Sequence, residues 1–504
     1  MRLDSAVRNI KSTMVIYMIK IILQFVVRLV FIRVLPIEYL GVNGLFNNIL
    51  AVLSLTELGI GPAIVYSLYK PLATGDMSTV KSIMRLFKKA YIYIGIIILV
   101  MGSFLTPCLD FFIKERPNID GLEYIYLLFV LDTGISYFYS YKRNLLIADQ
   151  RQYVANFYQG VCQVSLGVCQ IVLLLLTHSY WSFIILKVLA TFIENFAVAR
   201  KAEVVYPILH EKDVAPLARE IKKNIVRNVE ALIFHKVGGI VVFSTVNIII
   251  SKFIGLTTLG LYSNYCLIIG ALESISGQLF GSLTASIGNL NISTSSEKKV
   301  QIFKVLEFMT AWVAFYVSIG LYVMLNPLIE IWLGEQYIFA DVVIFVLVLN
   351  FYLTYMRRAV LVFKDAMGLF WNDRYKPLAE TIINLVTGIY LVQQYDITGA
   401  LLAMTISTLL APFWVEPYVV MRNGLDWPLK RYYGYYALYS GVTLLCGSGL
   451  KFLYGILFVQ NTILAFIGGV VLCTIVTNVI WTAIFYHTPE FKYIRDIIKC
   501  RLTR

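Results

Sequence analysis

The sequence predicts an all-α polytopic membrane protein with about 14 transmembrane helices. These helices would form two six-helix lobes related by a parallel repeat, followed by two C-terminal helices. Three observations lead to this fold class. Of the 504 residues, 59% are hydrophobic, well above the roughly 45–50% apolar content of soluble domains. The loops between apolar stretches alternate between basic and non-basic. The chain also resembles itself when it is shifted by 219 residues.

The apolar stretches give the helices in chain order. Each is long enough to cross a hydrocarbon core of about 30 Å, which needs about 20 helical residues. They centre on residues 12–34, 40–68, 86–109, 122–141, 153–177, 180–199, 230–251, 259–288, 305–328, 337–356, 377–394, 397–421, 432–453 and 462–486.

The distribution of Lys and Arg gives the orientation. Cations gather on one set of loops and at both ends, in residues 2–11, 70–89, 142–151, 200–227, 357–376 and 492–504. The opposite loops are poor in cations, and residues 330–341 contain none. By the positive-inside rule, both termini are cytoplasmic and the number of spans is even. We therefore expect a multi-pass membrane protein with both termini in the cytoplasm.

Composition and motifs exclude several other classes. The net charge of +13 does not indicate nucleic-acid binding, because orientation and anionic headgroups account for basic loops on the cytoplasmic side. The seven cysteines show no CxxC or Cys/His cluster, so neither a metal site nor a disulfide framework is expected. No cleavable signal peptide is evident, since the first apolar run is full length and contains Lys20 and Arg28. We expect no enzyme, because the chain has no Walker A, HExxH or GxSxG motif and its longest external loop, residues 109–121, is short.

The internal repeat defines the domains. The 219-residue shift places Arg8-Asn9 on Arg227-Asn228 and Leu40-Gly41 on Leu259-Gly260. Because each half holds an even number of spans, the halves share one orientation, as in parallel repeats. We predict an N-terminal lobe over 1–203, a cytoplasmic amphipathic linker over 204–228, a C-terminal lobe over 229–422, and two further helices with a basic cytoplasmic tail over 423–504.

The first span carries cations within its apolar stretch, where membrane helices rarely have charged residues. Its residues at i, i+3, i+7 and i+11 share one helical face, and these are Tyr17, Lys20, Gln24 and Arg28. Ionisable groups at bilayer depth need a partner or a wet cavity, so this face should point away from lipid. Arginine suits phosphate because its planar fork makes bidentate hydrogen bonds. Lys20 and Arg28 are therefore candidates for binding a diphosphate.

Further polar residues lie inside other spans. Asn43, Asn47 and Ser54 are candidates for lining a cavity, and Glu57, Asp132, Glu194 and Glu273 are candidates for ion coupling or for pairing with cations; the sixth span also carries Lys187. Two interpretations remain open. Lys20 and Arg28 could pair with Glu57, Asp132 or Glu194 and lock helices together. Alternatively, the cations line a substrate cavity and a carboxylate binds H⁺ or Na⁺, for which each charge crossing about 100 mV supplies about 2.3 kcal/mol.

Segments near the N-terminus resemble a known family. They are residues 25–33 (FVVRLVFIR), 38–46 (EYLGVNGLF), 53–61 (LSLTELGIG) and 66–72 (YSLYKPL). They closely resemble the polysaccharide-biosynthesis flippases of Gram-positive bacteria, in the multidrug/oligosaccharidyl-lipid/polysaccharide exporter superfamily. The resemblance implies a V-shaped, two-bundle fold that alternates between inward-open and outward-open states.

The same resemblance implies a function. The expected activity is transfer of undecaprenyl-diphosphate-linked oligosaccharide repeat units from the inner to the outer leaflet, for capsule or exopolysaccharide synthesis. The expected partners are membrane lipid and the polysaccharide polymerase and glycosyltransferases of the same pathway, with coupling to an ion gradient or the membrane potential. One departure argues against a peptidoglycan precursor as substrate: in the related lipid II flippases the second and eighth spans supply cavity cations, whereas here they carry Glu57 and Glu273. A multidrug or cation antiporter of the same fold is the alternative.

Overall fold

The computed structural model describes residues 2–57, 60–149, 151–211, 216–223, 225, 242–293, 295–369, 371–458 and 462–502. Within these ranges every regular element is helical. The chain divides into two compact units, which we call unit 1 (Met1–Gly260) and unit 2 (Leu261–Arg504). Among the described helices, seven are long and apolar enough to cross a membrane by length and composition.

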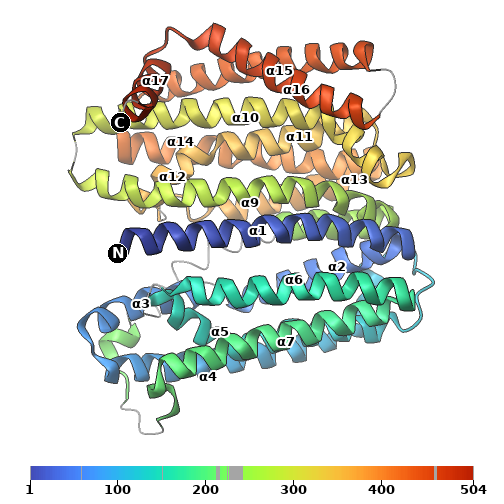
Figure 1. Ribbon diagram of the computed structural model, residues 1–504, viewed down its shortest axis with the longest axis vertical. Helices are drawn as coiled ribbons and strands as arrows, with labels where there is room; N and C mark the ends of the chain where they lie inside the picture. The colour runs from blue at the N-terminus through green and yellow to red at the C-terminus, as the bar shows by residue number, and fades with distance from the viewer. Residues whose placement is uncertain are drawn as a thin grey trace. The chain divides into compact units, whose positions relative to one another are not determined.

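Unit 1 is a bundle of long helices in which α4, α5, α6 and α7 run side by side (Figure 1). The first helix, α1, packs chiefly against α6. The α-helices are α1 (Arg2–Val34), α2 (Glu38–Leu53), α3 (Ile60–Thr74), α4 (Met77–Phe104), α5 (Leu122–Ala148), α6 (Gln152–Thr177) and α7 (Tyr180–Val205). Short 3-10 helices cover Ser54–Glu57 (η1), Thr106–Phe111 (η2) and Pro207–His210 (η3), and a π-helix covers Ile250–Ile254 (η4).

Side-chain size and capping explain how these helices form and meet. Asp76 caps α4 by accepting the backbone N–H of Thr79 at 3.0 Å, which satisfies one of the unpaired donors of the first turn. Gly167 of α6 lies directly under Leu23 of α1, and a Cβ there would come within 2.5 Å of the leucine side chain. The missing side chain therefore lets α1 and α6 approach closely.

Unit 2 is organised around α10, which contacts α11, α12, α15, α16 and α17. Phe308 and Phe315 of α10 pack with tilted rings against Trp481 of α16, which is fully buried. The α-helices are α9 (Leu256–Ser293, whose first residues belong to unit 1), α10 (Ser296–Leu333), α11 (Asp341–Met356), α12 (Arg358–Met367), α13 (Lys376–Leu410), α14 (Pro412–Val420), α15 (Leu429–Leu457), α16 (Ile463–Phe485) and α17 (Pro489–Leu502). A 3-10 turn covers Glu335–Tyr337 (η5) and a π-helix covers Met421–Leu425 (η6).

The range assigned to α13 contains two helical segments joined by a tight turn. Tyr395 and Asp396 have non-helical backbone angles, and Asp396 has φ 47°. Across the turn, a Cβ on Gly399 would lie 2.0 Å from the carbonyl oxygen of Leu391. Such an approach requires the chain to reverse, so the two spans expected over 377–394 and 397–421 are separate.

The predicted fold class is confirmed: described helices lie on each of the 14 apolar stretches. The stretch 230–251 is described only from residue 242. The stretch 40–68 is a broken span, because α2 ends at Leu53 and α3 begins at Ile60. Pro62 then falls in the first turn of α3, where its missing N–H costs no hydrogen bond. The basic tail contains a helix, α17, that was not anticipated. The domain boundaries remain predictions; in the linker, residues 219–223 are helical and 212–215, 224 and 226–228 lie outside the described residues.

A reciprocal contact joins the start of α2 to the start of α9. A Cβ on Gly41 would lie 2.0 Å from the carbonyl oxygen of Leu256, and one on Gly260 would lie 2.6 Å from that of Ile37. The 219-residue shift carries Ile37 to Leu256 and Gly41 to Gly260, so each glycine meets the carbonyl of its counterpart's helix. The two positions related by the 219-residue shift therefore contact each other in the same way from both sides, as in an isologous interface.

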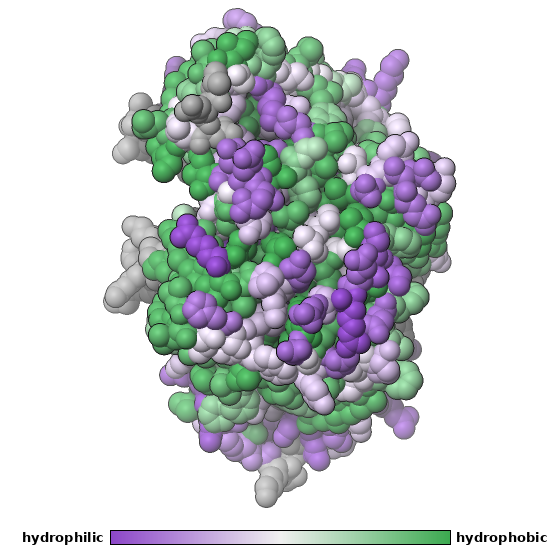
Figure 2. Space-filling view, turned by 90° about the vertical axis from the view of Figure 1, so that its right-hand side faces the viewer, coloured by the Kyte–Doolittle hydropathy of each residue, from purple (hydrophilic) through white to green (hydrophobic). Residues whose placement is uncertain are grey.

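The ends of the helices carry much of the hydrophilic surface. Figure 2 looks onto helix ends and shows hydrophilic side chains gathered there among apolar ones. Along the helices, by contrast, many large apolar side chains are exposed, such as Val168, Leu445 and Val479. Exposed leucine and valine on a helix flank are the expected surface for contact with lipid.

Candidate functional site

A half-buried ammonium group forms the centre of a polar cluster in unit 1, between α2, α5 and α7. The Nζ of Lys187 lies 3.3 Å from Oδ2 of Asp132, 3.5 Å from Oδ1 of Asn47 and 4.3 Å from the centre of the Phe129 ring. The lysine side chain is 26% exposed and the aspartate 13%. We call Lys187, Asp132, Asn47 and Asn43 the Lys187 cluster.

The hydrogen bonds of the Lys187 cluster orient its polar atoms. The amide of Asn47 donates to the backbone and side-chain oxygens of Asn43, at 2.7 and 2.9 Å, which leaves the Asn47 carbonyl oxygen facing Lys187. The second carboxylate oxygen of Asp132 is buried and accepts no hydrogen bond within the described part of the chain. An unsatisfied buried oxygen is costly, so this carboxylate is suited to taking up a proton or a cation.

A second cluster surrounds Glu57, at the end of η1. The Tyr91 hydroxyl donates to Oε1 of Glu57 at 3.0 Å and accepts from the Asn144 amide at 3.1 Å. Tyr137 hydrogen-bonds with both Ser54 and Glu57. The structure thus brings together the predicted residues Ser54 and Glu57 and holds the carboxylate with phenolic donors.

Glu194 is paired with a cation from a neighbouring helix. The guanidinium of Arg143 on α5 donates to Oε1 of Glu194 on α7 at 2.6 Å. Asp132 and Glu194 therefore have cation partners, Lys187 and Arg143, that were not among the predicted site residues. Both partners lie where a lysine or arginine interrupts or borders an apolar stretch, which is the sequence signal that could have identified them.

The predicted stripe on α1 is only partly described. Lys20 and Arg28 are half-buried and Gln24 is exposed, whereas the side chain of Tyr17 lies outside the described part. Across the ranges that the structure covers, no carboxylate forms an ion pair with Lys20. The neighbouring side chains Leu23 and Val27 pack against α6. Because they stand three and seven residues after Lys20, the polar stripe borders the packed face of α1.

In unit 2, the predicted candidate for ion coupling or pairing is Glu273. Its carboxylate interacts electrostatically with Arg358. Nearby lies a larger network that sequence reasoning missed. Glu416 is fully buried and binds Arg357 through two hydrogen bonds of 2.7 and 2.8 Å, as well as Lys376. Arg357 and Lys376 had been interpreted only as cytoplasmic loop cations. Glu416 inside an apolar stretch, at the level of that basic loop, was the available signal.

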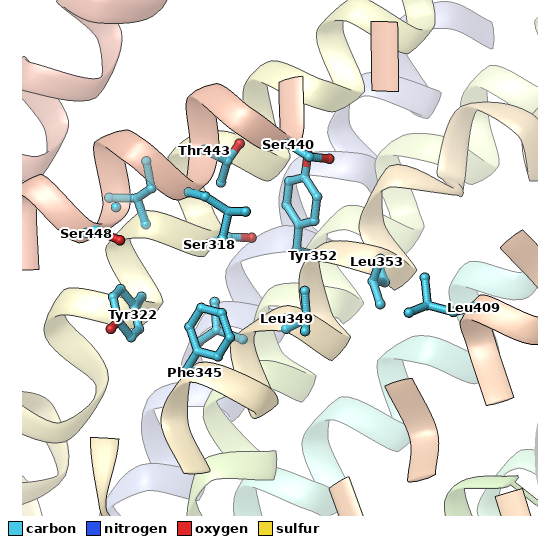
Figure 3. Close-up of a pocket in the computed structure, with 14 residues that line it drawn as sticks. Ser318, Tyr322, Phe345, Leu349, Tyr352, Leu353, Leu409, Ser440, Thr443 and Ser448 are labelled. Carbon is cyan, nitrogen blue, oxygen red and sulfur yellow. The ribbon is translucent and has the colours of Figure 1, made fainter. Parts of the chain in front are cut away.

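Unit 2 also contains a half-open cavity of about 230 Å³ between α10, α11, α13 and α15 (Figure 3). Ser440 and Thr443 of α15 face Phe345 and Leu349 of α11 across it. The Tyr352 hydroxyl is satisfied by the Ser440 hydroxyl at 3.0 Å. None of the described residues that line this cavity is charged, so they do not supply the charges that recognise an anionic group.

No group of three or more potential metal ligands occurs among the residues that the structure covers. The chemistry available at the Lys187 cluster is therefore that of fixed charges. It consists of a partly desolvated cation, a carboxylate with one unsatisfied oxygen, and two side-chain amides. Such a set can bind an anion and exchange a proton or a small cation.

Comparison with family models identifies the family to which the chain is similar. A family model described as "Polysaccharide biosynthesis protein" matches residues 6–287, more than half of the chain. No curated protein matches the sequence.

Solved structures of two kinds share the fold. A lipid II flippase, MurJ, in an inward closed conformation aligns with TM-score 0.65 and 12% identity, over 96% of this chain and 99% of that one. An inward-facing multidrug resistance MATE family transporter of the MOP superfamily aligns with TM-score 0.63 and 12% identity, over 81% of this chain and 94% of that one. A MOP superfamily transporter from Pyrococcus furiosus gives TM-score 0.53 and 12% identity, over 84% and 96%. At this identity the similarity establishes the fold. The chain is a multi-pass membrane protein with the MOP-superfamily fold, and it belongs to the polysaccharide biosynthesis protein family.

Proposed function

We propose that this protein translocates undecaprenyl-diphosphate-linked oligosaccharide repeat units from the inner to the outer leaflet of the bacterial cytoplasmic membrane, by alternating access. The observation that carries the proposal is the Lys187 cluster. In a family named for polysaccharide biosynthesis, unit 1 holds a cation at bilayer depth whose carboxylate partner is only loosely engaged, at 3.3 Å. A charged lysine at bilayer depth is costly, and a protein that carries an uncharged substrate would not need one.

Lys20 and Arg28 supply further positive charge from α1 in this mechanism. A diphosphate carries its charge on several oxygens, and arginine binds such groups through paired, charge-assisted hydrogen bonds. Asn43 and Asn47 offer amide groups for the first sugar or for the phosphate oxygens. Glycosyltransferases of a capsule or exopolysaccharide pathway would supply the repeat units, and the polysaccharide polymerase of that pathway would join them after translocation.

Asp132 couples an ion to this cycle. While Asp132 is ionised, it neutralises Lys187. When Asp132 binds H⁺ or Na⁺, the ammonium charge of Lys187 becomes available to an anionic substrate. Inward movement of that ion across a potential of about 100 mV would contribute about 2.3 kcal/mol per charge. Glu57, Glu194 and Glu273 are further coupling candidates. Glu57 and Glu194 are held by direct hydrogen bonds from Tyr91 and Arg143, and Glu273 interacts electrostatically with Arg358.

The test uses a deletion strain complemented with variants. Arg28→Ala and Lys187→Ala should abolish exposure of the lipid-linked repeat unit on the outer leaflet, with the unit accumulating on the inner leaflet. Arg33→Ala is the matched control, because Arg33 is an exposed cation near the end of the same helix, α1. Normal export by stably expressed Arg28→Ala and Lys187→Ala proteins would refute the proposal.

A multidrug or cation antiporter is the second candidate, and the acidic residues of unit 1 favour it. A carboxylate with one unsatisfied oxygen, Asp132, could receive an organic cation instead of a coupling ion. Increased sensitivity of the deletion strain to cationic dyes, with unchanged export of repeat units, would select this alternative.

A further inference from the structure

Unit 1 contains a second cationic site, next to the apolar core of the bundle, whose residues Met84 and Tyr141 also line the site. A cavity of about 500 Å³ lies between the start of α4, the last turns of α5 and α7, and the short helix η3. We call it the α4 pocket. Its charged lining consists of Lys81, Arg85, Lys88, Lys142, Glu203 and Glu211, and His210 also borders it.

The α4 pocket has an excess of positive charge on one helical face. Lys81, Arg85 and Lys88 are spaced i, i+4 and i+7, so their side chains project from the same side of α4. Lys142 faces them from α5. Four cations and two carboxylates leave an excess of two positive charges while His210 is neutral.

The two carboxylates are not equally fixed. Glu203 binds Lys142 at 2.5 Å, lies within 3.4 Å of Arg200, and is only 17% exposed. Glu211 binds Lys81 at 2.6 Å from the residue directly after η3, and it is 53% exposed. An exposed ion pair contributes little stability, so Glu211 can be exchanged for another anion at small cost. Glu203 instead holds Lys142 in place.

The size and chemistry of the α4 pocket fit a phosphate group. Lysine and arginine side chains converging on a cavity are the usual recognition set for phosphate oxygens. The pocket also lies among the basic segments 70–89 and 142–151 and the chain after α7. The charge distribution assigns all of them to the cytoplasmic side. Anionic lipid headgroups concentrate at that surface, and soluble phosphate compounds are present beside it.

We propose that the α4 pocket binds a phosphate group, carried either by an anionic lipid headgroup or by a soluble phosphate, and that the incoming phosphate replaces Glu211 on Lys81. This site is separate from the Lys187 cluster and does not depend on the proposed flippase activity. It would make the helix ends of unit 1 responsive to the inner leaflet or to a soluble anion.

The experiment measures binding to the purified full-length protein in nanodiscs. Inorganic phosphate is titrated against protein in phosphatidylcholine discs at constant ionic strength. In the second arm, discs containing phosphatidylglycerol replace phosphatidylcholine discs, without phosphate. A ligand that binds the folded state raises the thermal unfolding midpoint, and native mass spectrometry counts retained phosphatidylglycerol. Stabilisation by phosphatidylglycerol alone supports a lipid headgroup, and stabilisation by inorganic phosphate supports a soluble ligand.

Three variants test the geometry. The double variant Arg85→Ala/Lys88→Ala should weaken binding at least tenfold. Glu211→Gln should strengthen it several-fold, because the competing carboxylate is lost. Lys89→Ala is the matched control, since Lys89 is an exposed lysine next to Lys88 that does not line the pocket, and its affinity should equal that of the wild type.

Two outcomes would overturn the proposal. One is an equal loss of affinity in Lys89→Ala and in the double variant, which would indicate general attraction to a basic surface. The other is the absence of stabilisation by either ligand. If the double variant does not fold, Glu211→Gln still decides the question: unchanged or weaker binding by this variant contradicts the exchange of Glu211 for phosphate.

Discussion

Replacing Glu416 by glutamine should destabilise unit 2 strongly. The carboxylate is fully buried and neutralises Arg357 and Lys376, whose side chains are only 13% and 8% exposed. Glutamine has nearly the same shape but no charge, so two largely desolvated cations would lose their shared counter-charge. Removing one partner of a buried ion pair typically costs about 3–5 kcal/mol.

The corresponding shift can be measured as a thermal midpoint. For a domain of 150–250 residues, each 1 kcal/mol lowers the midpoint by about 2–4 °C, so we expect a decrease of roughly 6–20 °C by tryptophan fluorescence in detergent. Glu335→Gln is the control, because Glu335 is an exposed carboxylate of the same unit, and surface changes usually stay within about 0.5 kcal/mol. Adding Arg357→Met to Glu416→Gln should recover part of the loss, since the two sites are coupled. A midpoint of Glu416→Gln equal to that of Glu335→Gln would refute the reasoning.

Two further predictions concern the backbone and a helix cap in unit 1. Gly41→Ala should reduce the yield of monodisperse protein in size-exclusion chromatography, because its Cβ would lie 2.0 Å from the Leu256 carbonyl oxygen; Gly44→Ala, whose Cβ would be 3.6 Å from its nearest neighbour, should behave as wild type. Equal yields would contradict the close approach. Hydrogen bonds from Thr79 lower the pKa of Asp76. At a pH above the pKa that Asp76 has in the unfolded chain, the ionised cap therefore stabilises α4. This stability is lost as the pH falls through the lower pKa of the folded state. Asp76→Ala should therefore lower the thermal midpoint at pH 7, and its difference from wild type should disappear in acid; a difference that is constant with pH would exclude the charged cap.

Hydropathy predicted the helices because the length of an apolar stretch can be read from each segment without knowing what it packs against. A bend of the second span at Pro62 and its neighbouring glycines was one of two open interpretations. The sequence did not decide between them, because glycine and proline also occur in continuous membrane helices. The turn at Asp396 was predicted, since this residue separates two apolar stretches.

The ion pairs were harder to predict than the helices. Periodicity identifies which face of a helix is polar, but it does not identify the helix that this face meets. Asp132 and Lys187 belong to different stretches, and only the packing of α5 against α7 brings them within 3.3 Å. The roles of Lys20 and Arg28 remain predictions for the same reason.

The reciprocal contact of Gly41 and Gly260 constrains how this chain can change during evolution. The atom nearest to each glycine is a backbone oxygen, and at Gly260 the Ile37 side chain comes next, at 3.0 Å. No replacement of Leu256 or Ile37 could therefore remove the clash with the backbone. Most packing defects can be rescued by a second mutation that trims the opposing side chain, but a peptide carbonyl is common to every residue type. We therefore expect selection for second-site suppressors of Gly41→Ala to yield reversion or a displaced helix, and not a compensating substitution at the contact.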